Sequence, residues 1–124
     1  MSKTILVVDD SSSIRQLLSF TLKERGFTVL EAGNGLEALA KLTGDKISLV
    51  VCDVNMPEMD GIAFVKKIKD DAAYAEYRFT PVIMLTTETG EDKKAEGREA
   101  GVKAWITKPF TPDKLVSAIE KLIM

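Results

Sequence analysis

The chain has 124 residues, of which 45% are hydrophobic and 29% charged, and its 17 basic and 19 acidic residues give a net charge of −2. This length and composition are typical of one domain with a substantial core, so we expect residues 1–124 to form a single domain without an appended output domain. The charge balance lacks the basic excess of nucleic-acid-binding domains, and no apolar run approaches the roughly 18 residues of a membrane span.

The residue types that are missing narrow the chemistry further. The chain has no histidine, which excludes a Ser-His-Asp triad, a histidine-rich zinc site and a phosphohistidine on this chain. Cys52 is the single cysteine, so no internal disulfide can form, and we expect a reducing, cytoplasmic location. Any chemistry must therefore use carboxylates, hydroxyls, lysines or a hard metal ion.

The first half of the chain alternates short apolar runs with amphipathic helical patterns. The predicted elements are a strand at 4–8, a helix at 12–25 closed by Gly26, a strand at 27–31, a helix from Asn34 to about Gly44, and a strand at 47–52. The residues predicted to face inward from the two helices are Ile14, Leu17, Leu18, Thr21 and Leu22, and then Leu36, Leu39 and Leu42.

The second half repeats this alternation. The predicted elements are a helix starting near Gly61, a polar connection at 70–79, a strand at 81–85, a helix at 91–100, a strand at 103–107 and a last helix from Thr111 or Pro112. The predicted inward residues are Ile62, Val65 and Ile68, and in the last helix Leu115, Val116, Ile119, Leu122 and Ile123. Five alternations of strand and helix predict an α/β fold with a parallel sheet covered on both faces.

The stretch from Leu49 to Pro57 organises this arrangement. Its uncharged run up to Cys52 is typical of a strand buried on both faces, and Pro57 and Gly61 then end it. Asp53 is therefore predicted at the carboxyl end of a central strand, the edge where open α/β sheets bind their ligands.

Three acids, Asp9, Asp10 and Asp53, follow two of the predicted strands. They converge on one crevice if the strands take the order 2-1-3-4-5, which is a known order of doubly wound folds rather than one derived from this sequence. Clustered carboxylates repel one another, and a bound dication would relieve that repulsion; the oxygen ligands suit Mg²⁺. The alternative is that an acid such as Asp10 merely caps a helix or closes a turn.

A hydroxyl and an ammonium follow two further strands. Thr86 ends the fourth strand and Lys108 follows the fifth, so both are predicted to face the same crevice and could hold phosphate oxygens. We expect a cis bond between Lys108 and Pro109, which would aim the lysine inward. Taken singly, Thr86 could be a turn residue and Lys108 a solvated surface group.

These residues together resemble the bacterial response-regulator receiver domain. The residues that match are Asp9-Asp10, Asp53, Thr86 and Lys108-Pro109-Phe110, and the stretch 53–61 is similar to that family's phosphorylation-site segment. The similarity covers essentially the whole chain and is greatest to the stand-alone chemotaxis (CheY-like) type. It implies a flavodoxin-like fold with five strands in the order 2-1-3-4-5 and five helices.

The resemblance also implies a role for each matching residue. Asp53 would accept the phosphoryl group, Lys108 would contact it, and Thr86 would move toward it after transfer. The implied Mg²⁺ ligands are Asp9, Asp10, Asp53 and the backbone carbonyl of Asn55. Asn55 and Glu88 would tune the lifetime of the phosphorylated form.

The switch of this family couples the threonine to an aromatic residue on the fifth strand. The matching residue is Trp105, where Tyr or Phe is usual, so an inward rotation would need more room; the alternative is a half-exposed packing residue. Segment 90–101 carries few apolar anchors and an internal Gly97, which suits a mobile switching helix or, alternatively, a merely solvated one. We expect an output surface formed by this helix, the fifth strand and the last helix.

The implied partners are a histidine kinase as phosphodonor, a downstream protein such as the flagellar motor switch or another effector, and a phosphatase. The chain itself is expected to be a switch with slow self-dephosphorylation rather than an enzyme. A flavin-binding module using Ser11, Ser12 and Ser13 is one alternative, but the serines fit helix capping better, and Asp9 and Asp10 would repel a phosphate that lacks a metal. A magnesium-dependent phosphatase is another, although Asn55 stands where such enzymes carry a second Asp.

Overall fold

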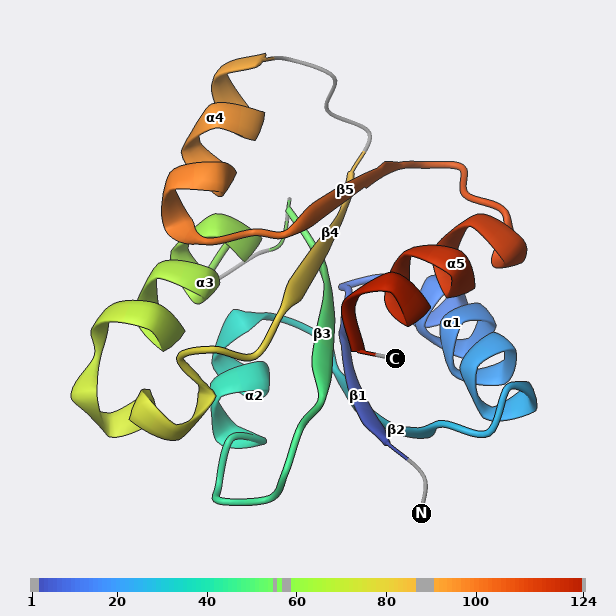
Figure 1. The fold of residues 1–124 in the computed structure, drawn as a ribbon, viewed down its shortest axis with the longest axis horizontal. Helices are drawn as coiled ribbons and strands as arrows, with labels where there is room; N and C mark the ends of the chain where they lie inside the picture. The colour runs from blue at the N-terminus through green and yellow to red at the C-terminus, as the bar shows by residue number, and fades with distance from the viewer. Residues whose placement is uncertain (1–2, 55, 57–58, 87–90, 124) are drawn as a thin grey trace.

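A computed structural model describes residues 3–54, 56, 59–86 and 91–123, with the backbone alone at 91–93. Strands and helices alternate along the chain, as Figure 1 shows. The strands are β1 Thr4–Val8, β2 Thr28–Ala32, β3 Leu49–Asp53, β4 Val82–Thr86 and β5 Ala104–Thr107. The helices are α1 Ser12–Glu24, α2 Gly35–Ala40, α3 Gly61–Asp70, the 3-10 helix η1 Ala72–Tyr77, α4 Glu91–Ala100 and α5 Pro112–Ile123.

All strands are parallel and lie in the order β2-β1-β3-β4-β5. The predicted α/β class, strand order and five α-helices are therefore confirmed, and β1 and β3 are neighbours. Val8 of β1 pairs with Cys52 of β3. The next residue of each segment, Asp9 or Asp53, therefore lies at the same edge of the sheet.

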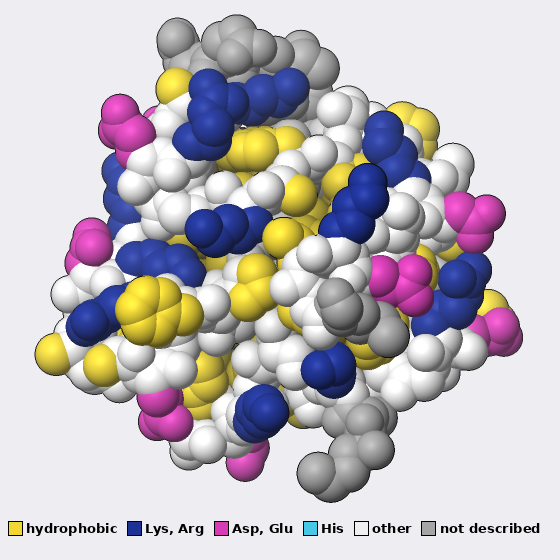
Figure 2. All heavy atoms as spheres, viewed as in Figure 1, with side chains coloured by type: hydrophobic (Ala, Val, Ile, Leu, Met, Phe, Trp, Pro, Cys, Tyr) yellow, Lys and Arg dark blue, Asp and Glu magenta, His cyan; other side chains and the backbone are white. Residues whose placement is uncertain are grey.

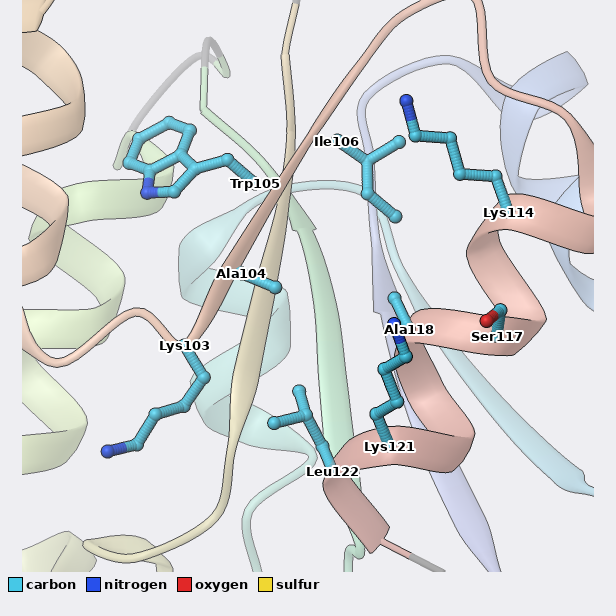
Figure 3. Close-up of a pocket in the computed structure, with 9 residues that line it drawn as sticks. All are labelled: Lys103, Ala104, Trp105, Ile106, Lys114, Ser117, Ala118, Lys121 and Leu122. Atoms are coloured by element: carbon cyan, nitrogen blue, oxygen red, sulfur yellow. The ribbon is translucent and has the colours of Figure 1, made fainter.

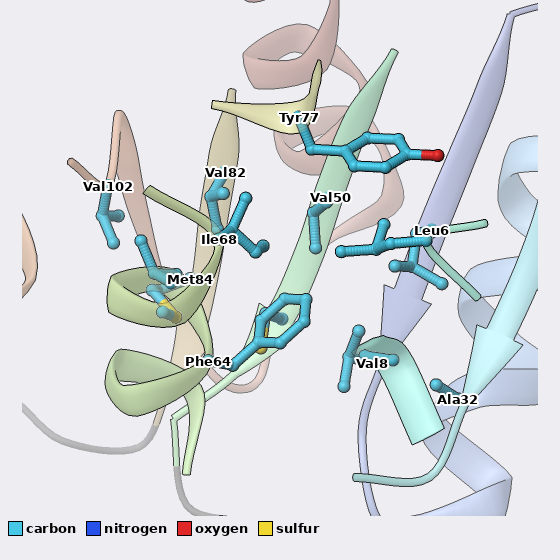
Figure 4. Packing of buried hydrophobic residues seen from close by; sticks show 14 of the residues in the cluster. Leu6, Val8, Ala32, Val50, Phe64, Ile68, Tyr77, Val82, Met84 and Val102 are labelled. Carbon is cyan, nitrogen blue, oxygen red and sulfur yellow. The ribbon is translucent and has the colours of Figure 1, made fainter. Parts of the chain in front are cut away.

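Helices cover both faces of the sheet, with α1 and α5 on one side and α2, α3 and α4 on the other (Figure 1). Alternate strand residues therefore enter two separate cores. Ile5 and Val7 pack in the core beneath α1 and α5, whereas Leu6 and Val8 pack in the core beneath α2 and α3. Figure 4 shows the second core, in which Phe64 lies among side chains from several strands.

Burial on both faces explains why β3 is an uncharged run until its last residue. All five residues of β3 are buried, and each fully buried Val or Leu side chain contributes about 1.5–3 kcal/mol. Asp53 is the exception to that composition, since it places a carboxylate at the end of an otherwise apolar strand.

Short polar side chains begin three of the helices. The side chains of Ser11, Asn34 and Asp60 accept hydrogen bonds from backbone N–H groups in the first turns of α1, α2 and α3. The expected capping by Asn34 is confirmed, and Gly26 adopts the positive φ of 90° expected after the end of α1.

Two leucines predicted to face inward are exposed instead. Leu17 is 45% exposed and Leu36 is 48% exposed, and α2 ends at Ala40 rather than near Gly44. In α2 the cause is a close approach: a Cβ on Gly35 would lie 2.8 Å from the Met59 side chain. Gly35 and Ala38 are the buried residues of α2, and Leu36 turns outward.

The predicted polar connection at 70–79 contains η1, which buries Tyr77. The Tyr77 hydroxyl donates to the carbonyl of Asp45 at 2.9 Å and accepts from the N–H of Gly44 at 2.7 Å. The Tyr77 side chain thus holds the loop between α2 and β3 in place through these two hydrogen bonds. The polar composition of segment 70–79 did not indicate this buried contact.

Most strands begin and end within one or two residues of the predicted ranges. No helix among the described residues is long and apolar enough to cross a membrane.

Candidate phosphoryl and metal site

Two buried carboxylates and one lysine meet at the carboxyl edge of the sheet. Asp9 follows β1 and is 1% exposed, and Asp53 ends β3 and is 6% exposed. The ammonium of Lys108 lies 3.0 Å from Asp9 Oδ2 and 3.5 Å from Asp53 Oδ1. One cation therefore bridges both acids, as expected if the side chains after β1, β3 and β5 share one crevice.

The backbone and carboxylate of Asp9 are both fixed by neighbours. Its Oδ1 accepts the N–H of Ser11 at 2.9 Å, and its carbonyl accepts the Arg15 guanidinium at 2.6 Å. Arg15 Nε lies 3.4 Å from Glu31 Oε1, and Glu31 Oε2 accepts a hydrogen bond from the Ser19 hydroxyl at 2.9 Å. This chain of contacts ties the end of β1 to α1 and β2.

The end of β3 requires a glycine beside it. A Cβ on Gly61 would lie 2.3 Å from the carbonyl oxygen of Asp53, and the N–H of Gly61 donates to the carbonyl of Val54 at 2.8 Å. The first turn of α3 thus passes directly over the strand end. Gly61 allows the close approach that holds the Asp53 backbone in place.

Three carboxylates in this pocket have the spacing of a metal site. Asp9, Asp10 and Asp53 each offer one oxygen, and these oxygens lie within 4.8 Å of one another. With all groups ionised, three carboxylates and one ammonium leave two negative charges in a partly buried pocket. An oxygen donor set of this charge fits a hard dication such as Mg²⁺.

The Lys108 ammonium is stabilised in its charged form. Burial alone would lower its pKa, but the hydrogen bond to Asp9 and the charges of Asp53 and Asp9 raise the pKa above its usual value. Beneath the pocket, burial and then the neighbouring charge of Asp53 raise the pKa of the Cys52 thiol, which therefore stays protonated. Cys52 is a packing residue of the core, as its sequence context indicates.

The expected cis bond between Lys108 and Pro109 is present. The N–H of Lys108 donates to the carbonyl of Thr86 at 2.9 Å, which joins the ends of β4 and β5. Thr86 is buried, at 1% exposure.

Thr86 and Trp105 lie on the same face of the sheet. Trp105 pairs with Met84, which precedes Thr86 by two residues, and strand side chains two apart point to the same side. Figure 3 shows the indole directed from β5 toward α4, opposite to Ile106, which points toward α5. The side chains of Thr86 and Trp105 therefore lie on the face of the sheet that α3 and α4 cover.

Gly97 of α4 makes room for the indole. A Cβ built on Gly97 would lie 2.2 Å from Trp105 Cζ2 and 3.0 Å from its Cη2. The indole Nε1–H is buried and has no hydrogen-bond partner within the described residues. Trp105 is thus half-buried against the helix backbone, and the glycine has a packing role that its sequence context did not indicate.

The structure brings together Asp9, Asp10, Asp53 and Lys108, and it places Thr86 at the adjacent strand end. Asn55 and Glu88 lie outside the described residues. Sequence reasoning missed Arg15 and its partner Glu31. The available signal was a pair of polar residues, Arg15 and Ser19, one turn apart on the inward side of α1.

Comparison with known proteins agrees with this arrangement. Residues 5–120 match the response regulator receiver domain family. The chain is 41% identical over 121 residues to the chemotaxis protein CheY1 of Helicobacter pylori, which covers 96% of this chain and 95% of that protein. It is 37% identical over 123 residues to the transcriptional regulatory protein SrrA of Staphylococcus aureus, covering 48% of that longer protein.

Among solved structures, the chemotaxis protein CheY4 of Vibrio cholerae superposes with a TM-score of 0.92 at 43% identity, covering 98% of this chain and 99% of that one. The chain therefore belongs to the response regulator receiver domain family, in its CheY-like type, and is a phosphoryl-accepting switch of two-component signalling.

Proposed function

We propose that Asp53 is the residue that accepts the phosphoryl group. The observation that carries this proposal is the position of its carboxylate, which lies at a strand end, 3.5 Å from the Lys108 ammonium and beside two further acids. Asp9 is also buried, paired with Lys108 and beside two acids, so the choice of Asp53 depends on its place at the end of the central strand β3 and on the resemblance of the stretch 53–61 to the phosphorylation-site segment of the family.

In the proposed reaction, a carboxylate oxygen of Asp53 attacks the phosphorus of the donor. A bond forms between that oxygen and phosphorus, the bond from phosphorus to the donor breaks, and the donor leaves with its bonding electrons. Lys108 holds the transferred oxygens by its charge, and Asp9 keeps the ammonium in position. The protein thus contributes positioning and charge stabilisation, which are the main requirements of phosphoryl transfer.

We propose Mg²⁺ as the resident metal, held by Asp9, Asp10 and Asp53 with the carbonyl of Asn55. The first three fit by donor type and spacing. When bound, the ion supplies positive charge that offsets the carboxylates and the phosphoryl oxygens. Asn55 and Glu88 are proposed to set how fast water hydrolyses the acyl phosphate, so that turnover by the chain itself is slow.

The proposed switch runs from Thr86 to Trp105. Phosphorylation adds charge at the carboxyl edge of the sheet, and the hydroxyl of Thr86 moves toward it. The space left beside Thr86 is on the face that Trp105 occupies, so a shift of the indole would change its contact with Gly97 and the position of α4.

We propose that a histidine kinase is the phosphodonor and that a downstream protein reads the switch, with chemotaxis as the pathway and the cytoplasm as the location. Leu17 and Phe20 of α1, 45% and 64% exposed, offer the kinase an apolar surface on the helix that follows Asp9 and Asp10. The target would use the output surface, where a groove of about 410 Å³ between β5 and α5 is lined by Lys103, Lys114 and Lys121 (Figure 3). A phosphatase and a target other than the flagellar motor remain alternatives for the same surfaces.

Tryptophan fluorescence tests the proposal because Trp105 is the only tryptophan. Acetyl phosphate with Mg²⁺ should change the emission of the native chain, and Asp53→Asn should abolish the change while leaving the emission without acetyl phosphate unaltered. An identical response in the Asp53→Asn variant would refute the assignment. Release of many phosphates per chain from model phosphomonoesters would favour the phosphatase alternative.

A further inference from the structure

A basic and aromatic hollow lies at the edge of the sheet opposite to the acidic pocket. It is lined by Lys69, Arg78, Phe79, Ala100, Gly101 and Lys103 and encloses about 380 Å³. We refer to these six residues as the basic–aromatic patch. They come from the ends of α3, η1 and α4 and from the residue before β5. On the face shown in Figure 2, Lys and Arg side chains gather over the middle, and acidic side chains lie mostly toward the margin.

Within the described part of the chain, the three cations of the patch have no acidic partner. None of the ion pairs among the described residues includes Lys69, Arg78 or Lys103. The Lys69 ammonium donates to the carbonyls of Arg78 at 2.5 Å and Thr80 at 2.9 Å. These contacts fix its position but leave its positive charge uncompensated. Burial and then the charge of Lys103 lower the pKa of Lys69, so a carboxylate in the hollow would relieve an existing repulsion.

An unusually exposed aromatic side chain lies beside these cations. Phe79 is 89% exposed, more than any other large hydrophobic residue of the described part. Its position is not that of a free loop, because the N–H of Thr80 donates to the carbonyl of Tyr77 at 3.1 Å and Tyr77 is buried. Phenylalanine and arginine are enriched at protein interfaces, where a few aromatic and arginine side chains provide most of the binding energy.

We propose that the basic–aromatic patch docks an acidic segment of a partner protein. Carboxylates of the segment pair with Lys69, Arg78 and Lys103, and an apolar side chain packs on Phe79. The net charge of −2 and the sequence pI of about 5.2 make the chain as a whole unsuited to a long polyanion, so a short acidic peptide is favoured over nucleic acid. A single exposed aromatic residue also gives too little apolar area for a membrane surface.

The patch and the phosphorylation pocket can be occupied at the same time. The patch precedes β4 and β5, and Asp53 ends β3, so the two are separated by the length of the strands, about 15 Å at 3.3 Å per residue. Lys103, however, also lines the groove between β5 and α5. Arg78 and Phe79 belong to the patch alone and are therefore the residues to test.

The experiment measures the fluorescence anisotropy of a labelled peptide of alternating glutamate and leucine, added to the full unphosphorylated chain. We expect binding that weakens with salt and is reduced about tenfold by Arg78→Glu and by Phe79→Ser. The matched controls are Lys23→Glu and Leu36→Ser, which change an exposed cation and an exposed leucine elsewhere and should leave binding unchanged. In NMR spectra of the isotope-labelled protein, adding the peptide should shift the backbone amide resonances of residues 69, 78–79 and 100–103.

Several outcomes would overturn the proposal. Binding that is unaffected by Arg78→Glu and Phe79→Ser would do so, as would resonance shifts confined to the groove between β5 and α5. Equal binding of a serine and glycine peptide would also contradict it. Single-stranded oligonucleotides or anionic lipid vesicles that bind more tightly than the peptide, and lose affinity in the same variants, would assign the patch to a different ligand. None of these results depends on phosphorylation of Asp53, so this proposal and the proposed function fail separately.

Discussion

Replacing Gly97 with alanine should fail to stabilise the protein, although the same change in an ordinary helix stabilises it. Gly97 lies inside α4, where alanine is favoured over glycine by about 1 kcal/mol. A Cβ there would lie 2.2 Å from Trp105 Cζ2, so the indole or the helix must move. Overpacking of this kind costs about 1–3 kcal/mol. We therefore expect the free energy of unfolding to be unchanged or to fall by up to about 2 kcal/mol.

A double-mutant cycle isolates the contact. In a Trp105→Phe background the fused-ring atoms that meet the new Cβ are absent, so Gly97→Ala should there stabilise the protein by about 1 kcal/mol. The coupling between the two positions should thus be about 1–3 kcal/mol. Ala95→Gly, at an exposed position of the same helix, measures the propensity difference without the contact and should be destabilising by about 1 kcal/mol in both backgrounds.

Urea unfolding followed by far-ultraviolet circular dichroism gives the four free energies of the cycle without relying on tryptophan emission. A stabilisation of about 1 kcal/mol by Gly97→Ala in the native background would refute the reasoning, because it would show that the indole does not lie against the helix. The emission of Trp105 in the Gly97→Ala variant offers a second check, since displacement of the ring should alter its solvent exposure.

Three further predictions follow from particular contacts. Tyr77→Phe removes a buried hydroxyl that donates one hydrogen bond and accepts another, so it should lower the free energy of unfolding by about 1–2 kcal/mol. The control is Tyr74→Phe, which removes a hydroxyl that makes no hydrogen bond in the described part and should lower the free energy of unfolding by less. Equal effects of the two substitutions would contradict the role assigned to the Tyr77 hydroxyl. Cys52 is fully buried, so a thiol reagent should not react with the native protein but should modify one thiol in denaturant; rapid native labelling would disprove the packing of β3. The N–H of Ala73, and then Lys67 one turn earlier, lower the pKa of the Asp71 carboxyl. The stability that the Asp71 carboxylate contributes to the fold is therefore fully present above its unfolded-state pKa and is lost as pH falls through the lower folded-state pKa. The stability difference between the native chain and Asp71→Asn should accordingly be constant from pH 7 to about pH 4 and shrink below it, and a difference that grows on acidification would be the wrong sign.

The parts of the site that were predictable are those that depend on strand ends. In a parallel sheet, each buried strand is a recognisable apolar run, and all carboxyl ends meet at one edge. The positions of Asp9, Asp53 and Lys108 at one edge of the sheet were therefore predictable from the sequence. The strand order came from the resemblance to a known family, because apolar runs alone do not say which strands are neighbours.

The parts that could not be predicted depend on how helices roll against the sheet. Leu36 was expected inward because it fits a helical apolar stripe, but the close approach of Met59 to Gly35 decides which side of α2 is buried. Gly97 was interpreted as a weak point of a mobile helix, whereas its contact with Trp105 shows a packing role. Both contacts join residues of different elements, and helical periodicity carries no information about them.

The contact of Arg15 with Asp9 was missed for a related reason. A charged residue on a predicted helix is usually assigned to its solvated side, and here the guanidinium reaches back to a backbone carbonyl at the end of β1. The spacing of Arg15 and Ser19 was visible, but their shared partner Glu31 belongs to a different strand.

The most direct test of the central claim is to locate the phosphoryl group itself. The native chain is incubated with acetyl phosphate and Mg²⁺, reduced with borohydride to mark the acyl phosphate, digested and analysed by mass spectrometry. We predict a single modified residue at Asp53, which disappears when the metal is chelated and in the Asp53→Asn variant. Modification at another residue, or the same yield without a divalent cation, would contradict the account.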